Sequence, residues 1–125
     1  NQHMEIKAIT DRVLLKNRRE VVKLHLYFKF LQHGIKPYES DLDIIVELYL
    51  FGGYKNAEEQ NRFLGLCKSK KLRKTDQSIR NTISKYINMG VFEKPKNRML
   101  KISDRFIPSL ECDRIVLQHI ISHAE

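Results

Sequence analysis

The sequence contains little cysteine, no tryptophan and no long apolar run. Its 125 residues include two cysteines, Cys67 and Cys112, which are not part of a CxxC pair. Two cysteines can form one bridge, but nothing in the sequence demands it, and we expect both to be reduced core residues in a cytosolic compartment. No apolar stretch approaches the roughly 20 residues that a membrane-spanning helix needs. A secretory signal pattern is also missing, so we expect a cytoplasmic protein with no membrane partner.

Patterns typical of enzymes are missing as well. Gly52-Gly53 and Gly65 do not form a glycine-rich phosphate loop, and no serine lies in a nucleophile elbow. The acidic residues of segment 41–47 fall on one expected helix, where the helix dipole and solvation explain them. We therefore expect no catalysis.

A metal site is also poorly supported. His119 and His123 are four residues apart, and Cys112 can share their helical face. A helical metal site usually adds an acid and a further ligand, which this segment does not supply. We expect ordinary surface or packed histidines, no metal and no cofactor.

Length and composition predict one soluble globular domain over residues 4–125. The hydrophobic share is 42% and the charged share 30%, which is typical of a folded chain. Residues 1–3 precede Met4 and resemble a cloning scar, so we exclude them from the fold.

Positive charge is concentrated in one stretch, residues 68–101. This stretch holds eleven of the 23 Lys and Arg residues but only two acids, Asp76 and Glu93. The rest of the chain is close to neutral. A localised basic block is the electrostatic feature expected where a polyanion binds.

The same stretch has the pattern of a helix followed by a hairpin. Thr75 or Asp76 can cap the helix, and Gly90 can end it in a left-handed conformation. Between them, apolar side chains recur on one helical face: Ile79, Ile83, Tyr86 and Ile87. We expect strands at 91–94 and 99–102, joined by a turn at 95–98.

This arrangement resembles a known family. The segment DQSIRNTISKYINMGVF is similar to the recognition helix and first wing strand of winged helix-turn-helix proteins, including the multiple-antibiotic-resistance type of bacterial regulator. The resemblance covers residues 40–102. It implies a mainly α fold with a small β-hairpin wing, to which the patterns of residues 17–34 and 109–124 add extra N- and C-terminal helices. The lysine-rich connection 68–74 is longer than the usual turn of this motif.

Four further helices are expected besides the helix and hairpin of residues 76–102. Residues 17–34 combine an Asn17 cap with a Gly34 stop, although their apolar residues also alternate with the period of a strand; length and end signals favour the helix. A second helix follows a Ser40 cap and ends at Gly52-Gly53, and it should form the centre of the core. Residues 5–16 remain open between strand and helix.

The third helix follows an Asn56 cap, with one face formed by Ala57, Phe63, Leu64 and Cys67. The last covers residues 109–124, with apolar positions at Leu110, Val116, Leu117, Ile120 and Ile121. This last helix can pack on the domain or mediate a homodimer.

The resemblance and the local charge together give a set of candidate DNA contacts. A helix fits the major groove, where amide and guanidinium side chains pair with base edges. The expected base contacts are Gln77, Arg80, Asn81 and Ser84. The expected backbone contacts are Lys68, Lys70, Lys71, Arg73, Lys74, Lys85 and Asn88. The wing would add Lys94, Lys96, Asn97 and Arg98. The alternative for each set is an ordinary solvated helix face, loop or turn.

The favoured function is duplex DNA binding through helix 76–89 and wing 91–102 in transcriptional regulation, in a bacterial or phage-infected cell. The alternative is a winged-helix protein-interaction module in a replication, packaging or polymerase assembly. RNA binding ranks lower, because no pair of RNA-stacking aromatic residues is present.

Overall fold

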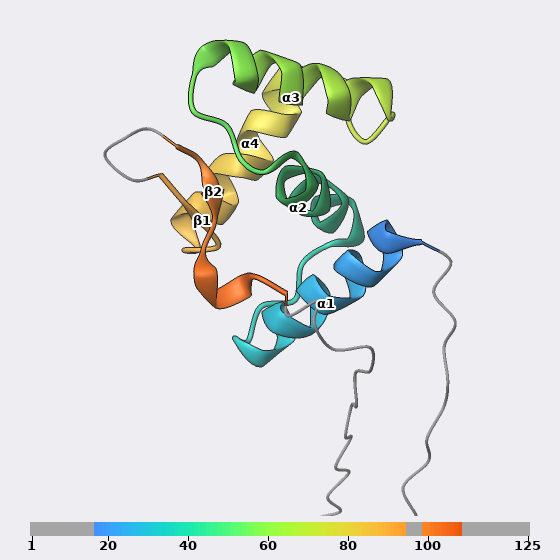
Figure 1. The fold of residues 1–125 in the computed structure, drawn as a ribbon, viewed down its shortest axis with the longest axis vertical. Helices are drawn as coiled ribbons and strands as arrows, with labels where there is room; N and C mark the ends of the chain where they lie inside the picture. The colour runs from blue at the N-terminus through green and yellow to red at the C-terminus, as the bar shows by residue number, and fades with distance from the viewer. Residues whose placement is uncertain (1–16, 95–98, 109–125) are drawn as a thin grey trace, which may run out of the picture.

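The computed structural model describes residues 17–94 and 99–108 and is mainly helical (Figure 1). Its elements are α1 (Arg18–Gln32), α2 (Glu39–Phe51), α3 (Ala57–Ser69), α4 (Asp76–Asn88), β1 (Phe92–Glu93), β2 (Lys101–Ile102) and the 3-10 turn η1 (Asp104–Phe106). The expected class, mainly α with a small antiparallel hairpin, is confirmed at that level. The expectations for residues 1–16, the turn at 95–98, and the helix 109–124 with Cys112, His119 and His123 lie outside the described residues.

Local end signals explain three of the four helices. The Asn17 side chain accepts a hydrogen bond from the Glu20 N–H at 2.9 Å, so α1 is a helix and the strand alternative is wrong. The Asn56 side chain caps α3 in the same way, at 2.8 Å. Thr75, not Asp76, caps α4. Each cap satisfies an amide group that the first helical turn leaves unpaired.

The start of α2 differs from the expectation. The helix begins at Glu39 after Tyr38, which makes no side-chain cap, so Ser40 lies inside the first turn. The first helical hydrogen bond runs from the Leu42 N–H to the Tyr38 carbonyl at 2.9 Å. Glu39 and Asp41 place negative charge in this turn, which complements the helix dipole without a capping hydroxyl.

The core is built around α2, as expected. This helix packs against α1, α3, α4 and β2 (Figure 1). Its buried apolar residues are Leu42, Ile44, Ile45, Val46 and Leu48. Such all-round burial is typical of a helix enclosed by the rest of a domain. On α3, Phe63, Leu64 and Cys67 are buried as predicted, whereas Ala57, at the first position of the helix, is exposed.

The hairpin is shorter than predicted and is tied to the helices. Phe92 pairs with Ile102 and Glu93 with Lys101. Val91 lies outside the strand because its N–H donates to the Tyr86 carbonyl and closes the end of α4. Leu100 pairs with Tyr54 through two backbone hydrogen bonds, at 3.0 and 2.8 Å.

The Tyr54–Leu100 bridge was not predicted. It joins the connection between α2 and α3 to the segment that leads into β2. The hairpin is therefore fixed to the helical body at the residue that precedes β2, on the side of the hairpin turn, and α4 also packs against β1.

Candidate nucleic-acid interface

Helix α4 has one buried and one exposed face. Ile79, Thr82, Ile83 and Tyr86 are buried against the core, as their spacing predicts for the three apolar residues. The exposed face carries Gln77, Arg80, Asn81, Ser84, Lys85 and Asn88. All four predicted base-contact residues therefore lie on the solvent side of one helix.

The polar groups of this face are partly ordered before any partner binds. The Gln77 side-chain N–H donates to the Asn81 side-chain oxygen at 2.8 Å, one helical turn away. The helix has a single acid, Asp76, whose carboxylate pairs with Lys68 at 2.7 Å. No acidic side chain therefore interrupts the exposed face between Gln77 and Asn88.

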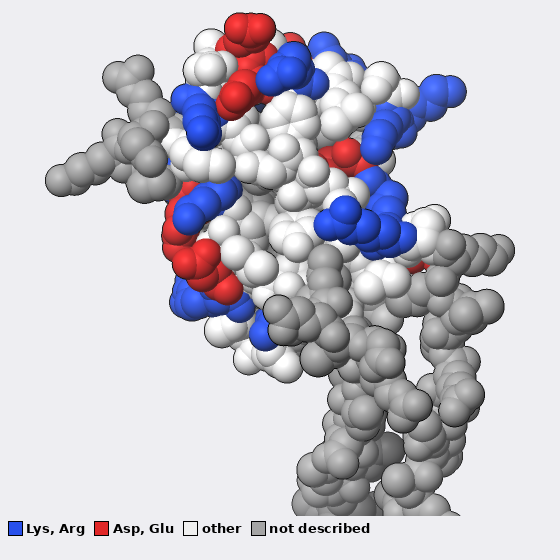
Figure 2. Space-filling model, viewed as in Figure 1, with Lys and Arg blue, Asp and Glu red and all other residues white. Residues whose placement is uncertain are grey.

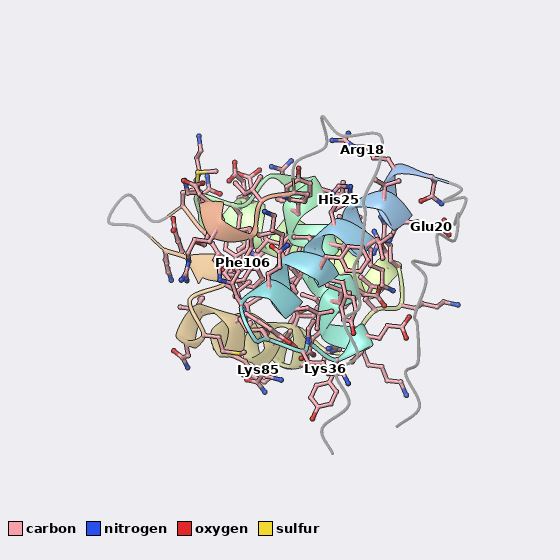
Figure 3. All side chains as sticks on the ribbon, turned by 90° about the horizontal axis from the view of Figure 1, so that it is seen from below. Arg18, Glu20, His25, Lys36, Lys85 and Phe106 are labelled. Atoms are coloured by element: carbon pink, nitrogen blue, oxygen red, sulfur yellow. The ribbon has the colours of Figure 1, made fainter. Side chains whose placement is uncertain are left out.

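One face of the molecule carries both signs of charge. Figure 2 shows a face on which basic and acidic side chains are interspersed, with acidic groups at the top over α3. Helix α4 lies behind α2 and α3 in Figure 1, and Figure 3 places Lys85 at the outer edge of the molecule on the α4 side.

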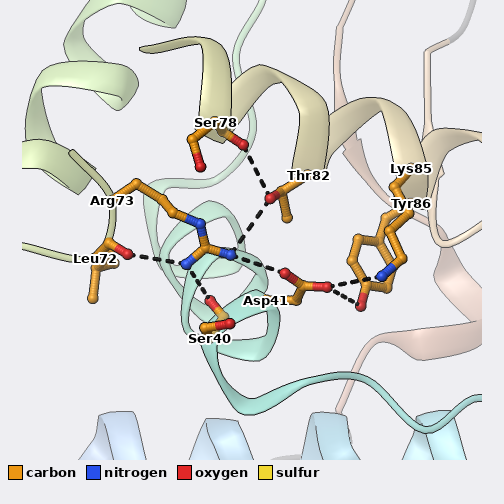
Figure 4. A network of polar contacts seen from close by, with 8 residues as sticks. All are labelled: Ser40, Asp41, Leu72, Arg73, Ser78, Thr82, Lys85 and Tyr86. Carbon is orange, nitrogen blue, oxygen red and sulfur yellow. Dashed lines mark hydrogen bonds and ion pairs between the residues drawn. The ribbon is translucent and has the colours of Figure 1, made fainter. Parts of the chain in front are cut away.

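A buried carboxylate holds α4 and the loop before it in place (Figure 4). Asp41, on α2, is 7% exposed. Its carboxylate accepts from the Arg73 guanidinium at 2.8 Å, from the Lys85 ammonium at 3.1 Å and from the Tyr86 hydroxyl at 2.9 Å. A buried charge is tolerated when several donors satisfy it, as they do here.

Arg73 completes this network. Its guanidinium also donates to the carbonyls of Ser40 and Leu72, each at 3.0 Å, and lies 3.5 Å from the Thr82 hydroxyl. The Arg73 side chain is 15% exposed. A planar guanidinium has five N–H donors in fixed directions, which suits such a linking role between a helix and a loop.

The environment of Tyr86 favours its neutral form. Burial is the largest cause, followed by the Asp41 carboxylate, which accepts a hydrogen bond from the Tyr86 hydroxyl and repels a phenolate; both raise the pKa of Tyr86 well above its usual range. The hydroxyl therefore remains a hydrogen-bond donor to Asp41 at physiological pH.

A second buried carboxylate, Glu47, lies further along α2 and is 1% exposed. It accepts from Arg19 of α1 and from Lys70 at 2.9 Å. Asp41 and Glu47 together bind α1, the α3–α4 loop and α4 to the central helix.

The α3–α4 loop borders an open hollow of about 640 Å³. The residues that line it are Lys68, Lys71, Leu72, Arg73, Lys74, Thr75 and Ser78, and the surface they present to the hollow is mostly carbon. The hollow lies at the N-terminal end of α4, where the unpaired amide groups of a helix favour negative charge. Lys71 adopts a left-handed backbone with φ 59°.

These contacts divide the predicted backbone-contacting residues into two groups. Lys68, Lys70, Arg73 and Lys85 form ion pairs within the chain. Lys71 and Lys74 are exposed, and no ion pair engages them within residues 17–94 and 99–108. The prediction for Arg73 needs revision, because its guanidinium is directed into the chain. The sequence alone did not predict this role, because Asp41 lies 32 residues before Arg73.

The wing is only partly described. Lys94 is exposed at the end of β1. Lys96, Asn97 and Arg98 lie outside the described residues, so their positions remain predictions. The positive charge of Arg80 acts to lower the pKa of Tyr54, the residue that pairs with Leu100. Burial is the larger effect there and raises the Tyr54 pKa.

The described residues contain neither a metal-binding cluster nor a membrane-spanning helix. Within the described part of the chain, no group of three or more His, Cys, Asp or Glu side chains is arranged to hold a metal ion. Among these residues, no helix is long and apolar enough to cross a membrane. Cys67 is a free, buried thiol.

Comparison of the chain with protein-family models, curated proteins and solved structures gave no significant match. A functional assignment therefore depends on the geometry and chemistry of its own residues.

Proposed function

We propose that this protein binds duplex DNA through the exposed face of α4, as a winged helix-turn-helix domain active in transcriptional regulation. The observation that carries the proposal is the composition of this face. Five exposed polar or basic side chains, Gln77, Arg80, Asn81, Ser84 and Asn88, include no acid, and the helix that carries them is held from behind by buried side chains and by the Lys85–Asp41 contact. A rigid helix with amide and guanidinium groups is suited to reading base edges in the major groove.

The elements beside α4 support the same proposal. Lys71 and Lys74 border the hollow at the start of the helix, and Lys94 extends from the neighbouring hairpin. Cations placed at both sides of a groove-binding helix would neutralise phosphates and fix its orientation. In this proposal Gln77, Arg80, Asn81 and Ser84 contact bases, whereas Lys71, Lys74, Lys94 and Asn88 contact the backbone.

Lys68, Lys70 and Lys85 would make weaker contacts with the DNA backbone. Their side chains are 42%, 46% and 46% exposed, so each can reach an anion while its carboxylate partner stays close. Arg73 is assigned to positioning the loop and not to the DNA.

A second candidate is a protein-interaction module of a larger assembly. The internal ion pairs favour it, because four cations of the basic stretch already have carboxylate partners. An acidic protein surface and a nucleic acid differ in salt dependence: only the latter releases a dense layer of condensed counterions.

The test is a titration of a labelled random-sequence duplex at several salt concentrations. For DNA binding, log affinity should fall steeply with log salt, with a slope of roughly −0.9 for each phosphate contact. Arg80→Ala should weaken binding by about tenfold and reduce the slope by about one if Arg80 contacts a phosphate, or relax sequence preference if it contacts guanine.

Arg18→Ala is the matched control, because Arg18 is an exposed arginine at the start of α1 and its loss changes the net charge equally. This variant should bind as the wild type does. A flat salt dependence, or equal losses in the two variants, would overturn the proposal. Selection from a random duplex pool then separates a regulator from a nonspecific binder.

A further inference from the structure

Two amide side chains on the exposed face of α4 are joined by a hydrogen bond. Gln77 and Asn81 lie four residues apart, so their side chains are neighbours on one side of the helix. The Gln77 Nε2–H donates to the Asn81 Oδ1 at 2.8 Å. Both side chains are exposed, so their remaining polar atoms are accessible to a bound partner.

This hydrogen bond makes the two amides chemically unequal. A glutamine or asparagine amide has two N–H donors and one accepting carbonyl oxygen. Gln77 gives one N–H to its neighbour and retains the other N–H together with its carbonyl oxygen. Asn81 retains both N–H groups, whereas its oxygen already accepts a bond. Gln77 therefore presents one donor and one acceptor, and Asn81 presents mainly donors.

Base edges in the major groove differ in the same respect. Adenine shows an acceptor, N7, beside a donor, its N6 amino group, whereas guanine shows two acceptors, N7 and O6. Cytosine offers a single donor there, and thymine a single acceptor beside its methyl group. Adenine alone satisfies both groups that Gln77 retains, because guanine would place its O6 against the Gln77 carbonyl oxygen.

Asn81 opposes the other orientation of the Gln77 amide. A free glutamine side chain can rotate and direct both of its N–H groups at the two acceptors of guanine. Since Asn81 holds one of these N–H groups, that rotation would break the existing hydrogen bond. The backbone beneath the pair is itself fixed, because Ile79, Ile83 and Tyr86 are buried on the other side of α4.

We propose that Gln77 reads adenine in the major groove, and that Asn81 makes it discriminate against guanine by accepting its hydrogen bond. Base selection of this kind rests on the proposed binding of duplex DNA by α4. Gln77 then contacts the base, whereas Asn81 positions Gln77 and keeps its own N–H groups for an acceptor on a neighbouring base. A bidentate contact between an amide and adenine discriminates between bases by about tenfold.

Parallel selections from a random duplex pool, read by sequencing, test the roles of the two amides. The wild type should enrich sites in which one position favours adenine over guanine by about tenfold. Gln77→Ala should bring this ratio close to one at that position alone. Asn81→Ala should lower it to about threefold, because the released amide can also bind guanine. Asn81→Asp retains the accepting oxygen and should keep the wild-type ratio, although its added negative charge weakens total binding.

Gln32→Ala is the matched control, because Gln32 is an exposed glutamine at the end of α1, and its loss should leave the ratio unchanged. Three results would overturn the proposal while DNA binding stands: a wild type that selects no base, an adenine preference that persists in Gln77→Ala, or a wild-type ratio in Asn81→Ala. A flat salt dependence of the wild type would instead overturn DNA binding, and base selection with it.

Discussion

At the scale of single residues, Asp41 shows how a short polar side chain determines the position of others. Its two carboxylate oxygens accept hydrogen bonds from Arg73, Lys85 and Tyr86, which belong to the α3–α4 loop and to α4. Charges at that depth are costly unless they are paired, so each partner depends on the carboxylate. The exposed face of α4 keeps its orientation partly because of this one residue.

Replacement of Asp41 by Asn should therefore destabilise the protein. The Arg73 side chain is only 15% exposed, so its guanidinium would be left largely buried without a charged partner. We expect a loss of about 3 kcal/mol in the free energy of unfolding. Urea denaturation measures this loss. Asp43→Asn is the control: its side chain is 30% exposed and pairs with Lys23 at 2.9 Å, and it should cost less than about 1 kcal/mol. Equal costs for the two variants would contradict the role given to Asp41.

The buried Cys67 thiol should make the free energy of unfolding decrease at alkaline pH. Burial disfavours the thiolate and raises the pKa of Cys67 to about 11, from an ordinary value of 9.0. Between these two values the unfolded chain has released the proton and the folded chain has kept it, so stability falls as pH rises. We expect a decline that begins near pH 9 and reaches up to about 2 kcal/mol by pH 11.

Unfolding titrations from pH 8 to pH 10 measure this decline. Cys67→Ala should be less stable than the wild type at pH 8, because it leaves a small cavity, but its profile should be flatter between pH 9 and pH 10. Tyr54 and Tyr86, whose pKa values are also raised, contribute to the decline only above about pH 10. Parallel profiles for the two proteins would show that the Cys67 thiol does not contribute.

At the scale of elements, a pair of glycines connects α2 to the hairpin. Gly52 and Gly53 both have positive φ values, 87° and 80°. A Cβ atom on Gly52 would meet nothing within 4 Å, whereas one on Gly53 would lie 2.3 Å from the Leu100 carbonyl oxygen. That oxygen accepts the hydrogen bond from Tyr54, so close backbone contact is needed for the bridge.

Gly53→Ala should thus cost much more than Gly52→Ala. Both variants place a side chain in a left-handed conformation, which costs about 1 kcal/mol. Gly53→Ala must in addition move Leu100 and break the Tyr54 bridge, and we expect a total of about 3 kcal/mol or more. Thermal unfolding compares the two. If their melting temperatures fall by the same amount, the bridge does not hold the hairpin to the helices.

Prediction from the sequence mostly worked where a signal is local, although the Ser40 cap, an equally local signal, was wrong. The caps Asn17, Asn56 and Thr75 act on amides three residues away, and Gly90 ends α4 in the conformation that glycine prefers. Hydrophobic spacing likewise identified the buried face of α4. These features depend on a few neighbouring residues, so a sequence contains them directly.

Features that depend on distant partners were not predictable in this way. The Tyr54–Leu100 bridge joins residues 46 positions apart, and the Arg73–Asp41 contact spans 32. A lysine-rich segment has the same composition whether its side chains bind phosphates or carboxylates of the same chain. For this reason the sequence placed Arg73 among DNA contacts, whereas the structure directs its guanidinium inward.

At the scale of the whole molecule, α2 connects the parts through two buried acids. Asp41 binds the α3–α4 loop and α4, and Glu47 binds the same loop and α1. The loop residues Lys70 and Arg73 are three positions apart, so each ion pair helps to hold the loop where the other forms. The start of α4 thus depends on both contacts together.

This arrangement predicts energetic coupling between the two acids. In Asp41→Asn the loop should become less ordered, so that the Lys70–Glu47 pair contributes less and Glu47→Gln removes less stability than it does in the wild type. We expect the double variant to cost about 1 kcal/mol less than the sum of the single variants, measured by urea denaturation.

The combination of Asp41→Asn with Asp43→Asn supplies the control cycle, because Asp43 pairs with Lys23 of α1 and not with the loop. Its costs should add within about 0.5 kcal/mol. Additive costs for Asp41 and Glu47 as well would mean that the two ion pairs stabilise the fold independently. The start of α4 would then be held by the Asp41 contacts alone, and Lys70 would be free to serve a bound phosphate without any effect on the position of the helix.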